Sequence, residues 1–269
     1  MNIFRTLVLR SQILKHLAFI LRNKLTIGDN SFQATNIHFK NNIIDMRRGK
    51  KQSLLCEATS FLRDCSVLMV GRENLVSVKK GTEVYGENGQ AFHIDGNNNQ
   101  VIIGENSSIR NTVFYISGNN NRIILSDDIS CYGAEFHLRQ DNNQIVIGKG
   151  TSFHGRNGYP VHIVGDEGRN IIIGDDCMFS KDIQIRSSDS HNIVDSSGHR
   201  LNPAEDVFIG DHVWISMGAT LLKGTWIPSH SVIAAGAVCT SKYLEENSII
   251  AGNPARVVKK QVDWDRKYL

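Results

Sequence analysis

Prolines, aromatic residues and an excess of charge of one sign are all scarce in this sequence. Only 4 of its 269 residues are proline and 7% are aromatic, whereas 23 are glycine. This composition suits short stacked strands joined by glycine corners. The net charge of +3, with no Lys/Arg run interleaved with aromatics, gives no indication of nucleic-acid binding.

Cysteine is also sparse, and its pattern argues against a zinc site. The five cysteines are odd in number and none belongs to a Cys-x-x-Cys pair. Three of them, Cys131, Cys177 and Cys239, fall in repeat sequence where a small apolar residue is wanted. We therefore expect buried thiols in a reducing cytosol, and no metal.

The most regular stretch of the chain runs from Val207 to Val258. Its short aliphatic units recur about every six residues and alternate with glycine and polar corners. The units are Phe208-Ile209-Gly210, Val213-Trp214-Ile215, Thr220-Leu221-Leu222 and Val232-Ile233-Ala234-Ala235-Gly236. Such a step is the signature of a β-solenoid, whose coils are too small to bury their own apolar faces and must stack.

A longer repeat, rich in asparagine, precedes this stretch. The phrases that begin at Asn97, Asn119 and near Asn142 each pass from an Asn run into an aliphatic triplet, and they recur every 22 residues. A fourth, at Arg169-Asn170, follows after 26. Asparagine tolerates positive φ, and its amide can stack on the Asn of the next coil, so we expect structural ladders at these corners.

Four segments are expected. Residues 1–24 have the apolar spacing of an amphipathic helix, which caps the open end of the solenoid or lies on the inner membrane face. This segment is too short and too charged to span a bilayer, and basic residues interrupt any signal-peptide core. Residues 25–95 are irregular early rungs, 96–258 the main β-helix domain and 259–269 a C-terminal tail. A cytoplasmic location is expected, with peripheral membrane contact through 1–24 as the alternative.

Three motifs carry a resemblance to a known family. They are Ile209-Gly210-Asp211-His212-Val213-Trp214-Ile215, Ala234-Ala235-Gly236-Ala237-Val238 and Ala251-Gly252-Asn253-Pro254-Ala255-Arg256-Val257-Val258. In this order they resemble the hexapeptide-repeat acyltransferases, and most of all the galactoside, xenobiotic and sugar O-acetyltransferase branch. The resemblance implies an all-β, left-handed parallel β-helix that forms a homotrimer with active sites between subunits. Only the resemblance gives the left-handed sense, because crossovers are otherwise almost always right-handed.

The resemblance also singles out a histidine. A Ser-x-x-His segment of the family precedes its Val-Trp-Ile rung, and there the histidine is the general base. Here the matching residue is His191, in a polar insertion that lengthens the next Ile-Gly interval to 36 residues. A base with a pKa of about 6.5 can take the proton of an attacking hydroxyl, worth roughly 10²–10⁴ in rate. Asp189 or Asp195 is expected to orient the imidazole, and His199 is a further residue that could contact the acceptor.

On the donor side, the resemblance implies acetyl-CoA and no metal. Small residues on successive coils leave room for a pantetheine arm, a tryptophan walls the tunnel, and basic residues after the Asn-Pro-Ala turn meet the nucleotide phosphates. The residues expected to contact coenzyme A are Trp214, Gly218, Ala219, Ala235, Gly236, Thr240, Arg256 and Lys259.

The function that these features predict is acetyl-CoA-dependent O-acetylation of a hydroxyl on a sugar or a bacterial surface polysaccharide, such as a capsule, lipopolysaccharide or exopolysaccharide. Two alternatives stay open: N-acetylation of an amino-sugar nucleotide, and an inactive β-helix that acts as a scaffold or binding protein. Aromatic and polar groups such as Phe114-Tyr115 and Phe136-His137 are expected in columns on one face, which either close the surface or form a shelf for a glycan acceptor.

Overall fold

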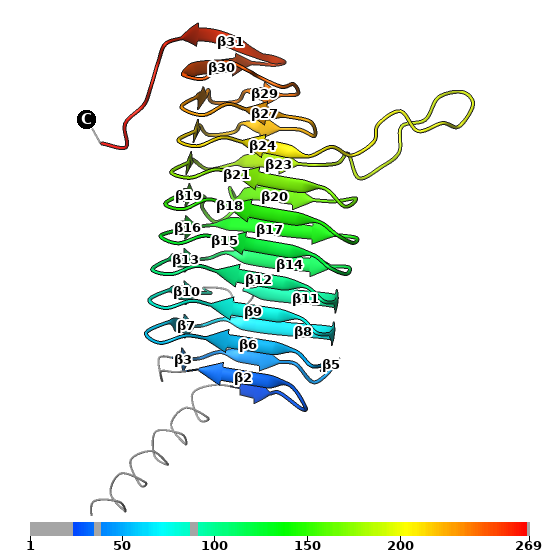
Figure 1. Ribbon diagram of the computed structural model, residues 1–269, viewed down its shortest axis with the longest axis vertical. Coiled ribbons are helices and arrows are strands. Elements are labelled where there is room, and N and C mark those ends of the chain that lie inside the picture. Colours follow the sequence, from blue (N-terminus) through cyan, green and yellow to red (C-terminus); the bar gives the residue numbers. More distant parts are fainter. Residues whose placement is uncertain (1–23, 35–38, 87–90, 268–269) are drawn as a thin grey trace, which may run out of the picture.

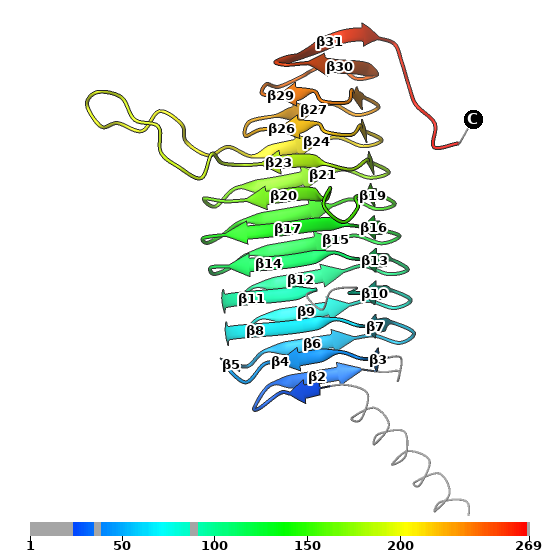
Figure 2. The ribbon, with the colours of Figure 1, turned by 180° about the vertical axis from the view of Figure 1, so that it is seen from behind.

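The chain folds into a stack of short strands, shown by a computed structural model that describes residues 24–34, 39–86 and 91–267 (Figures 1 and 2). None of the described residues is helical. Successive coils lie on one another along the long axis, and most coils contribute one strand to each of three sheets. Among the described residues, no helix has the length and apolar character needed to cross a membrane.

The three sheets, here named A, B and C, form the three sides of the stack. Sheet A comprises β1 (Lys24–Thr26), β4 (Ile43–Asp45), β5 (Gly49–Lys50), β8 (Ser66–Arg72), β11 (Phe92–Asn97), β14 (Val113–Ser117), β17 (Ala134–Arg139), β20 (Val161–Gly165), β23 (Ile183–Arg186), β26 (Thr220–Leu221) and β29 (Val238–Cys239). Sheet B comprises β2 (Ser31–Ala34), β6 (Ser53–Cys56), β9 (Leu75–Val78), β12 (Gln100–Ile103), β15 (Arg122–Leu125), β18 (Gln144–Ile147), β21 (Asn170–Ile173), β24 (Val207–Ile209) and β27 (Trp226–Ile227). Sheet C comprises β3 (Phe39–Lys40), β7 (Phe61–Arg63), β10 (Glu83–Tyr85), β13 (Ser108–Arg110), β16 (Ser130–Tyr132), β19 (Ser152–His154), β22 (Met178–Phe179), β25 (Trp214–Ile215), β28 (Val232–Ile233), β30 (Ser248–Gly252) and β31 (Ala255–Lys260).

Strand pairing between the coils is parallel throughout these sheets, except for the final β30–β31 hairpin. Partners on adjacent coils are 22 residues apart through the asparagine phrases, as Gln100 and Arg122 are. Above β24 the spacing falls to 18, as it is between Asp211 and Ser229. The coils at the C-terminal end are therefore shorter than those below them.

The interior is a continuous column of alternate strand residues, because side chains of a strand point in turn to its two faces. Aliphatic side chains such as Ile94, Ile123 and Ile171 are fully buried. A phenylalanine ladder runs inside the stack, with Phe92 and Phe114 stacked at 4.9 Å between ring centroids. Offset aromatic stacking adds to the burial of such rings. The ladder continues through Phe136, Phe153 and Phe179.

The predicted asparagine ladders are confirmed. Asn98 and Asn120 have φ of 56° and 58°, and the amide of the first donates to the side-chain oxygen of the second at 2.9 Å. One position further along, Asn99, Asn121 and Asn143 are buried, and each side-chain oxygen accepts the backbone N–H of the next at 3.0 and 2.9 Å. These bonds satisfy backbone groups that the corner would leave unpaired.

The fold class predicted from the sequence is confirmed in its all-β, parallel and solenoidal character. The helix predicted over 1–24 lies outside the described residues up to residue 23, and Lys24 belongs to β1. Residues 25–95, irregular in sequence, stack in the same sheets as the rest. The cysteines are buried as expected, and burial raises the pKa of the Cys131 and Cys177 thiols to about 12.

The expected columns of aromatic and polar residues divide between two faces. Phe114 and Phe136 are interior residues, so their assignment to an outer surface was wrong. Tyr115 and His137, their sequence neighbours, face outward from sheet A with ring centroids 5.4 Å apart. Strand alternation separates each pair, because adjacent side chains point to opposite faces.

The C-terminal residues 261–267, here called the strap, run back along the stack beside sheet C (Figure 1). The Trp264 ring stacks on His212 at 4.2 Å and 12°, and its indole N–H donates to the His212 carbonyl at 2.8 Å. Arg266 donates to the Asp176 carboxylate at 2.7 Å and to Ser152 Oγ at 2.8 Å. The strap thereby joins coils that are far apart in sequence.

Candidate active site

The polar insertion forms a long protruding loop, here called the excursion loop, over residues 187–206 (Figures 1 and 2, yellow). It leaves the stack at the end of β23 in sheet A and returns at the start of β24 in sheet B. The loop therefore projects from the corner between these two sheets. Solenoid insertions of this kind map to one face and are often functional.

A salt bridge holds the returning limb of the excursion loop to the coil below. Arg200 donates two hydrogen bonds to the Glu167 carboxylate, at 2.5 and 2.8 Å, and Ser188 Oγ bonds the same carboxylate. The Arg200 guanidinium, followed by the Ser188 hydroxyl, lowers the pKa of Glu167 to about 2. Bidentate Arg–carboxylate pairs have a specific geometry, so this contact fixes the root of the excursion loop.

A second cluster ties the loop to the coil above. Lys223, just beyond β26, donates to Asp189 Oδ2 at 2.5 Å, and Asn202 Nδ2 donates to the same oxygen at 2.7 Å. Asn202 also donates to the His191 carbonyl at 2.8 Å and accepts from the Ile193 backbone N–H at 2.7 Å. Hydrogen bonding by Lys223 lowers the pKa of Asp189 and keeps it ionised.

His191 lies between these anchors with an exposed side chain. Its backbone carbonyl is fixed by Asn202, whereas no hydrogen bond joins its imidazole to a described residue of the chain. Asp189, one of the two carboxylates expected to orient it, is bonded instead to Lys223 and Asn202. The structure thus presents the imidazole outward, available to a group from outside this chain.

Asp195, the other expected carboxylate, faces His199 rather than His191. Its Oδ2 lies 3.2 Å from His199 Nδ1, and its Oδ1 accepts the backbone N–H groups of Ser197 and His199 at 2.8 and 2.9 Å. These bonds close the turn at the tip of the loop. His199 therefore has the carboxylate partner that was expected for His191.

The outer part of the excursion loop carries exposed apolar side chains. Ile193, Val194 and Leu201 are 57%, 53% and 60% exposed. The Leu201 backbone N–H donates to the Ile193 carbonyl at 2.8 Å, so the two limbs form a narrow ribbon that holds these side chains outward. Large apolar groups gathered on a projecting ribbon indicate a contact with another surface.

The small residues expected to contact coenzyme A lie in two stacked turns that join sheet C to sheet A. Gly218 and Ala219 precede β26, and Ala235 and Gly236 precede β29. Gly218 and Gly236 have φ of +73° and +68°, which only glycine adopts without strain. The Gly236 N–H donates to the Met217 carbonyl at 2.9 Å, so the turns stack directly. The small residues leave room at this corner beside the exposed Met217 side chain.

The remaining donor-side residues are more dispersed. Trp214 lies on sheet C with its ring 6.2 Å from that of Trp264, and Arg256 and Lys259 are exposed on β31 at the C-terminal end of the stack. Thr240 is exposed and directly follows β29, at the opposite edge of sheet A from the small-residue turns. A single chain therefore brings the small residues of the two turns together, whereas Thr240 lies away from them.

The excursion loop and the small-residue turns occupy the two long edges of the same sheet. The loop begins where sheet A ends, and the turns end where sheet A begins. A single chain consequently does not bring His191 to the small-residue turns. Both halves of the expected site are present, but at different corners of the stack.

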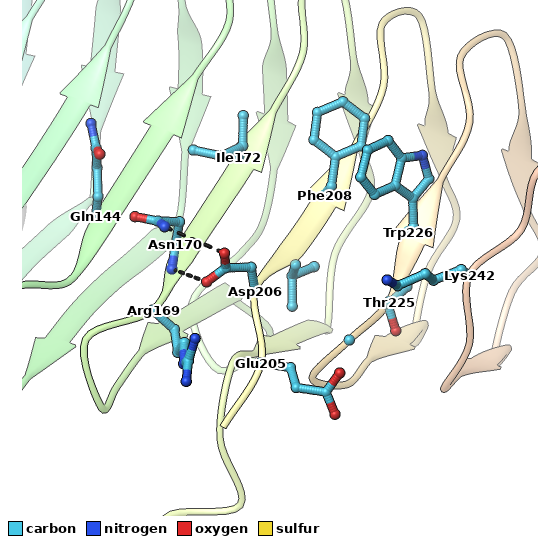
Figure 3. A pocket seen from close by; sticks show the side chains of 12 residues that line it. Gln144, Arg169, Asn170, Ile172, Glu205, Asp206, Phe208, Thr225, Trp226 and Lys242 are labelled. Atoms are coloured by element: carbon cyan, nitrogen blue, oxygen red, sulfur yellow. Dashed lines mark hydrogen bonds between the residues drawn. The ribbon is translucent and has the colours of Figure 1, made fainter. Parts of the chain in front are cut away.

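A surface pocket of about 580 Å³, which the sequence did not indicate, lies on the outer face of sheet B (Figure 3). Phe208 and Trp226 form its wall, with ring centroids 4.2 Å apart. Arg169, Lys242 and Glu205 lie around the rim. An exposed indole face beside charged groups can stack on a sugar ring and bind its substituents. The two rings meet because Phe208 of β24 pairs with Trp226 of β27 on the next coil. This pairing was not evident from the sequence, so the pocket was not predicted.

Comparison with known proteins gives relatives of one kind. No family profile matches the chain. It is 34% identical over 98 residues to the polysialic acid O-acetyltransferase of Escherichia coli O1:K1, covering 36% of this chain and 32% of that protein. It is 35% identical over 105 residues to the polysialic acid O-acetyltransferase of Neisseria meningitidis, covering 39% and 48%. The match thus spans a third to a half of these curated relatives. The solved structure of the polysialic acid O-acetyltransferase OatWY superposes with a TM-score of 0.65 at 29% identity, over 89% of this chain and 92% of that one.

Proposed function

We propose that this chain is a member of the hexapeptide-repeat acyltransferases, which it resembles, and that it transfers an acetyl group from acetyl-CoA to a hydroxyl of a bacterial surface polysaccharide. The observation that supports this most directly is the excursion loop. Its root is fixed by Glu167–Arg200 and Asp189–Lys223, while its histidine is left open to solvent. The names of the relatives support an anionic, sugar-based acceptor.

In this mechanism His191 takes the proton of the acceptor hydroxyl as the oxygen attacks the thioester carbon. The tetrahedral intermediate then collapses and releases the thiolate of coenzyme A, which takes up a proton. Transfer is direct, because an acceptor held against the thioester needs a base and oxyanion donors but no acyl-enzyme. Backbone N–H groups of the small-residue turns are the groups that we expect to serve the oxyanion.

The site is proposed to be completed by a second copy in a homotrimer. The excursion loop and the small-residue turns occupy opposite edges of sheet A. A cyclic arrangement with sheet A toward the axis sets the excursion loop of each copy beside the small-residue turns of the next. The exposed Ile193, Val194 and Leu201 then have a surface to contact.

Thiol release from acetyl-CoA in the presence of polysialic acid and other surface polysaccharides tests the proposal. Wild type and His191→Ala are compared, and we expect the mutant to lose about two orders of magnitude or more of the acceptor-dependent rate. His230→Ala, a change in the turn between β27 and β28, is the matched control and should retain the rate.

Two other outcomes would change the conclusion. If His191→Ala keeps full activity and His199→Ala loses it, the Asp195–His199 pair is the base. If neither acetyl transfer nor coenzyme A binding is found with any acceptor, a scaffold role fits better than catalysis.

A further inference from the structure

A cluster of two histidines and a glutamate lies on the outer face of sheet A, away from the excursion loop and the small-residue turns, on the face that the proposed homotrimer turns toward its axis. Glu135 and His137 belong to β17, and His162 belongs to β20 on the next coil. One potential ligand atom of each side chain lies within 4.8 Å of the other two. The cluster is half-buried, so water only partly solvates it.

The nitrogen atoms of this cluster are arranged for coordination rather than for hydrogen bonding. His137 Nε2 is buried and makes no hydrogen bond to a described residue, although Glu135 Oε2 lies 3.4 Å away. On the next coil, His162 Nδ1 lies 3.1 Å from Gln184 Oε1, an acceptor. When the proton of His162 is on Nδ1, this nitrogen donates to Gln184 Oε1 and the lone pair of Nε2 is free. A histidine that donates its second N–H to an oxygen in this way is typical of metal ligands.

We propose that Glu135, His137 and His162 bind a divalent first-row transition ion such as Zn²⁺, with Gln184 orienting His162. Two histidines and one carboxylate are a known protein ligand set for Zn²⁺, with water in the fourth position. Bonds of about 2.0–2.1 Å place tetrahedral ligands about 3.3 Å apart. The Glu135–His137 separation of 3.4 Å already matches that value, so His162 alone has to move inward.

The charges around the cluster are mixed. The Glu135 carboxylate lies 3.4 Å from His137 Nε2 and favours a cation there, whereas Arg139 and Arg186 oppose one.

A second cluster, of His212, His230 and Asp263, is the natural comparison and is the weaker candidate. Both ring nitrogens of His212 are already engaged, Nδ1 with Asp176 at 2.6 Å and Nε2 with the Trp264 carbonyl at 3.0 Å. A metal there would displace the strap. The sequence predicted no metal from its cysteine pattern, and the proposed site contains no cysteine and joins residues of different coils.

Calorimetric titration of chelator-treated protein with Zn²⁺ tests this inference independently of acetyl transfer. Wild type is expected to bind one ion per chain at micromolar or lower concentration, with a rise in Tm that depends on Zn²⁺ concentration. His137→Gln and His162→Gln should each abolish this binding, and Gln184→Ala should weaken it about 10–100-fold. His230→Gln, in the second cluster, should bind as wild type does.

The inference is overturned if wild type binds no Zn²⁺ at micromolar concentration, or if His137→Gln and His162→Gln both bind as wild type does. Loss of binding in His230→Gln alone would assign the ion to the second cluster instead. Circular dichroism of each variant shows that it is folded. Glu135→Gln, which keeps the size of the side chain, provides a further variant in which reduced affinity is expected.

Discussion

Lys223 links the excursion loop to the body of the stack through a single side chain. Its side chain is 17% exposed, and its ammonium group makes a 2.5 Å contact with Asp189, two residues before His191. A partly buried ion pair of this kind positions its neighbours more than it contributes to stability. Lys223 thus matters for where His191 lies.

We predict that Lys223→Ala lowers kcat for acetyl transfer about tenfold, because the root of the loop loses one of its two anchors. The KM for acetyl-CoA should change little, since the small-residue turns are untouched. Steady-state kinetics measure both values. Lys149→Ala, which removes an exposed lysine paired with Asp128, is the control and should leave kcat unchanged. An unchanged kcat in Lys223→Ala would contradict the anchoring role.

His212 makes the strap sensitive to pH. Partial burial alone would lower its pKa, but the bonds to Asp176 and the Trp264 carbonyl outweigh burial and raise it above 6.5. The charged groups around the ring are Asp176, Asp263, Arg266 and the titratable His230. Because the folded-state pKa is raised, the stabilisation is complete below the unfolded value of 6.5 and is lost as pH rises through the folded value.

The strap should therefore open more often at pH 8.5 than at pH 5.5. Hydrogen exchange of the Trp264 indole N–H, corrected for the intrinsic rate, measures this, and we expect the opening to increase between pH 5.5 and pH 8.5. His212→Gln should remove the pH dependence, whereas His230→Gln should keep most of it. A pH-independent opening rate in wild type would show that His212 is not the group that holds the strap.

At the scale of the element, the asparagine corners supply the specificity of stacking. Asn121 is fully buried, its oxygen accepts from the N–H groups of Asn143 at 2.9 and 3.0 Å, and its amide donates to the Gln140 carbonyl at 2.8 Å. Removing this side chain leaves a buried donor and a buried acceptor without partners.

We predict that Asn121→Ala lowers the free energy of unfolding by about 3 kcal/mol, since each orphaned buried group costs about 1–3 kcal/mol. Asn119→Ala, in the exposed ladder of the same corner, should cost under about 1 kcal/mol because water replaces its bonds. Urea denaturation followed by far-ultraviolet circular dichroism compares the two. Equal losses would mean that burial does not decide the role of the ladder.

The repeats in the sequence predicted the stacked coils. They did not predict which side chains contact the acidic residues of the excursion loop. The Asn phrases and six-residue units define coils because the same side-chain pattern must recur wherever coils stack. The partners of Asp189 and Asp195 were not predictable, because Lys223 and His199 meet them through loop geometry. The strap was expected only as a tail, since no periodic pattern marks a segment held by Trp264 and Arg266.

At the scale of the whole molecule, the proposed homotrimer predicts that each active site needs the excursion loop of one copy and the small-residue turns of the next. A mixing experiment tests this. His191→Ala supplies an intact donor turn without a base, and Ala235→Trp supplies a base beside a blocked turn. Each homotrimer should be nearly inactive.

After co-refolding of the two variants in equal amounts, about a quarter of the sites in random trimers combine an intact loop with an intact neighbouring turn. We expect about a quarter of the wild-type rate. Tandem purification on two different tags confirms that mixed trimers have formed. No recovery in such trimers would mean that each chain supplies its whole site by itself.

The constant 22-residue spacing of the asparagine coils makes each of them an interchangeable module. Excising residues 97–118 would join Gly96 to Asn119 and set the coil of Asn119 on the coil of Arg72, because Asn97 and Asn119 occupy equivalent positions. The pairing of every coil above that of Asn119 would stay as it is. The copy number of these modules can therefore vary without moving the loop or the turns above them. The height of the molecule and its chemistry can evolve separately, by whole-coil duplication or loss in the lower part of the stack.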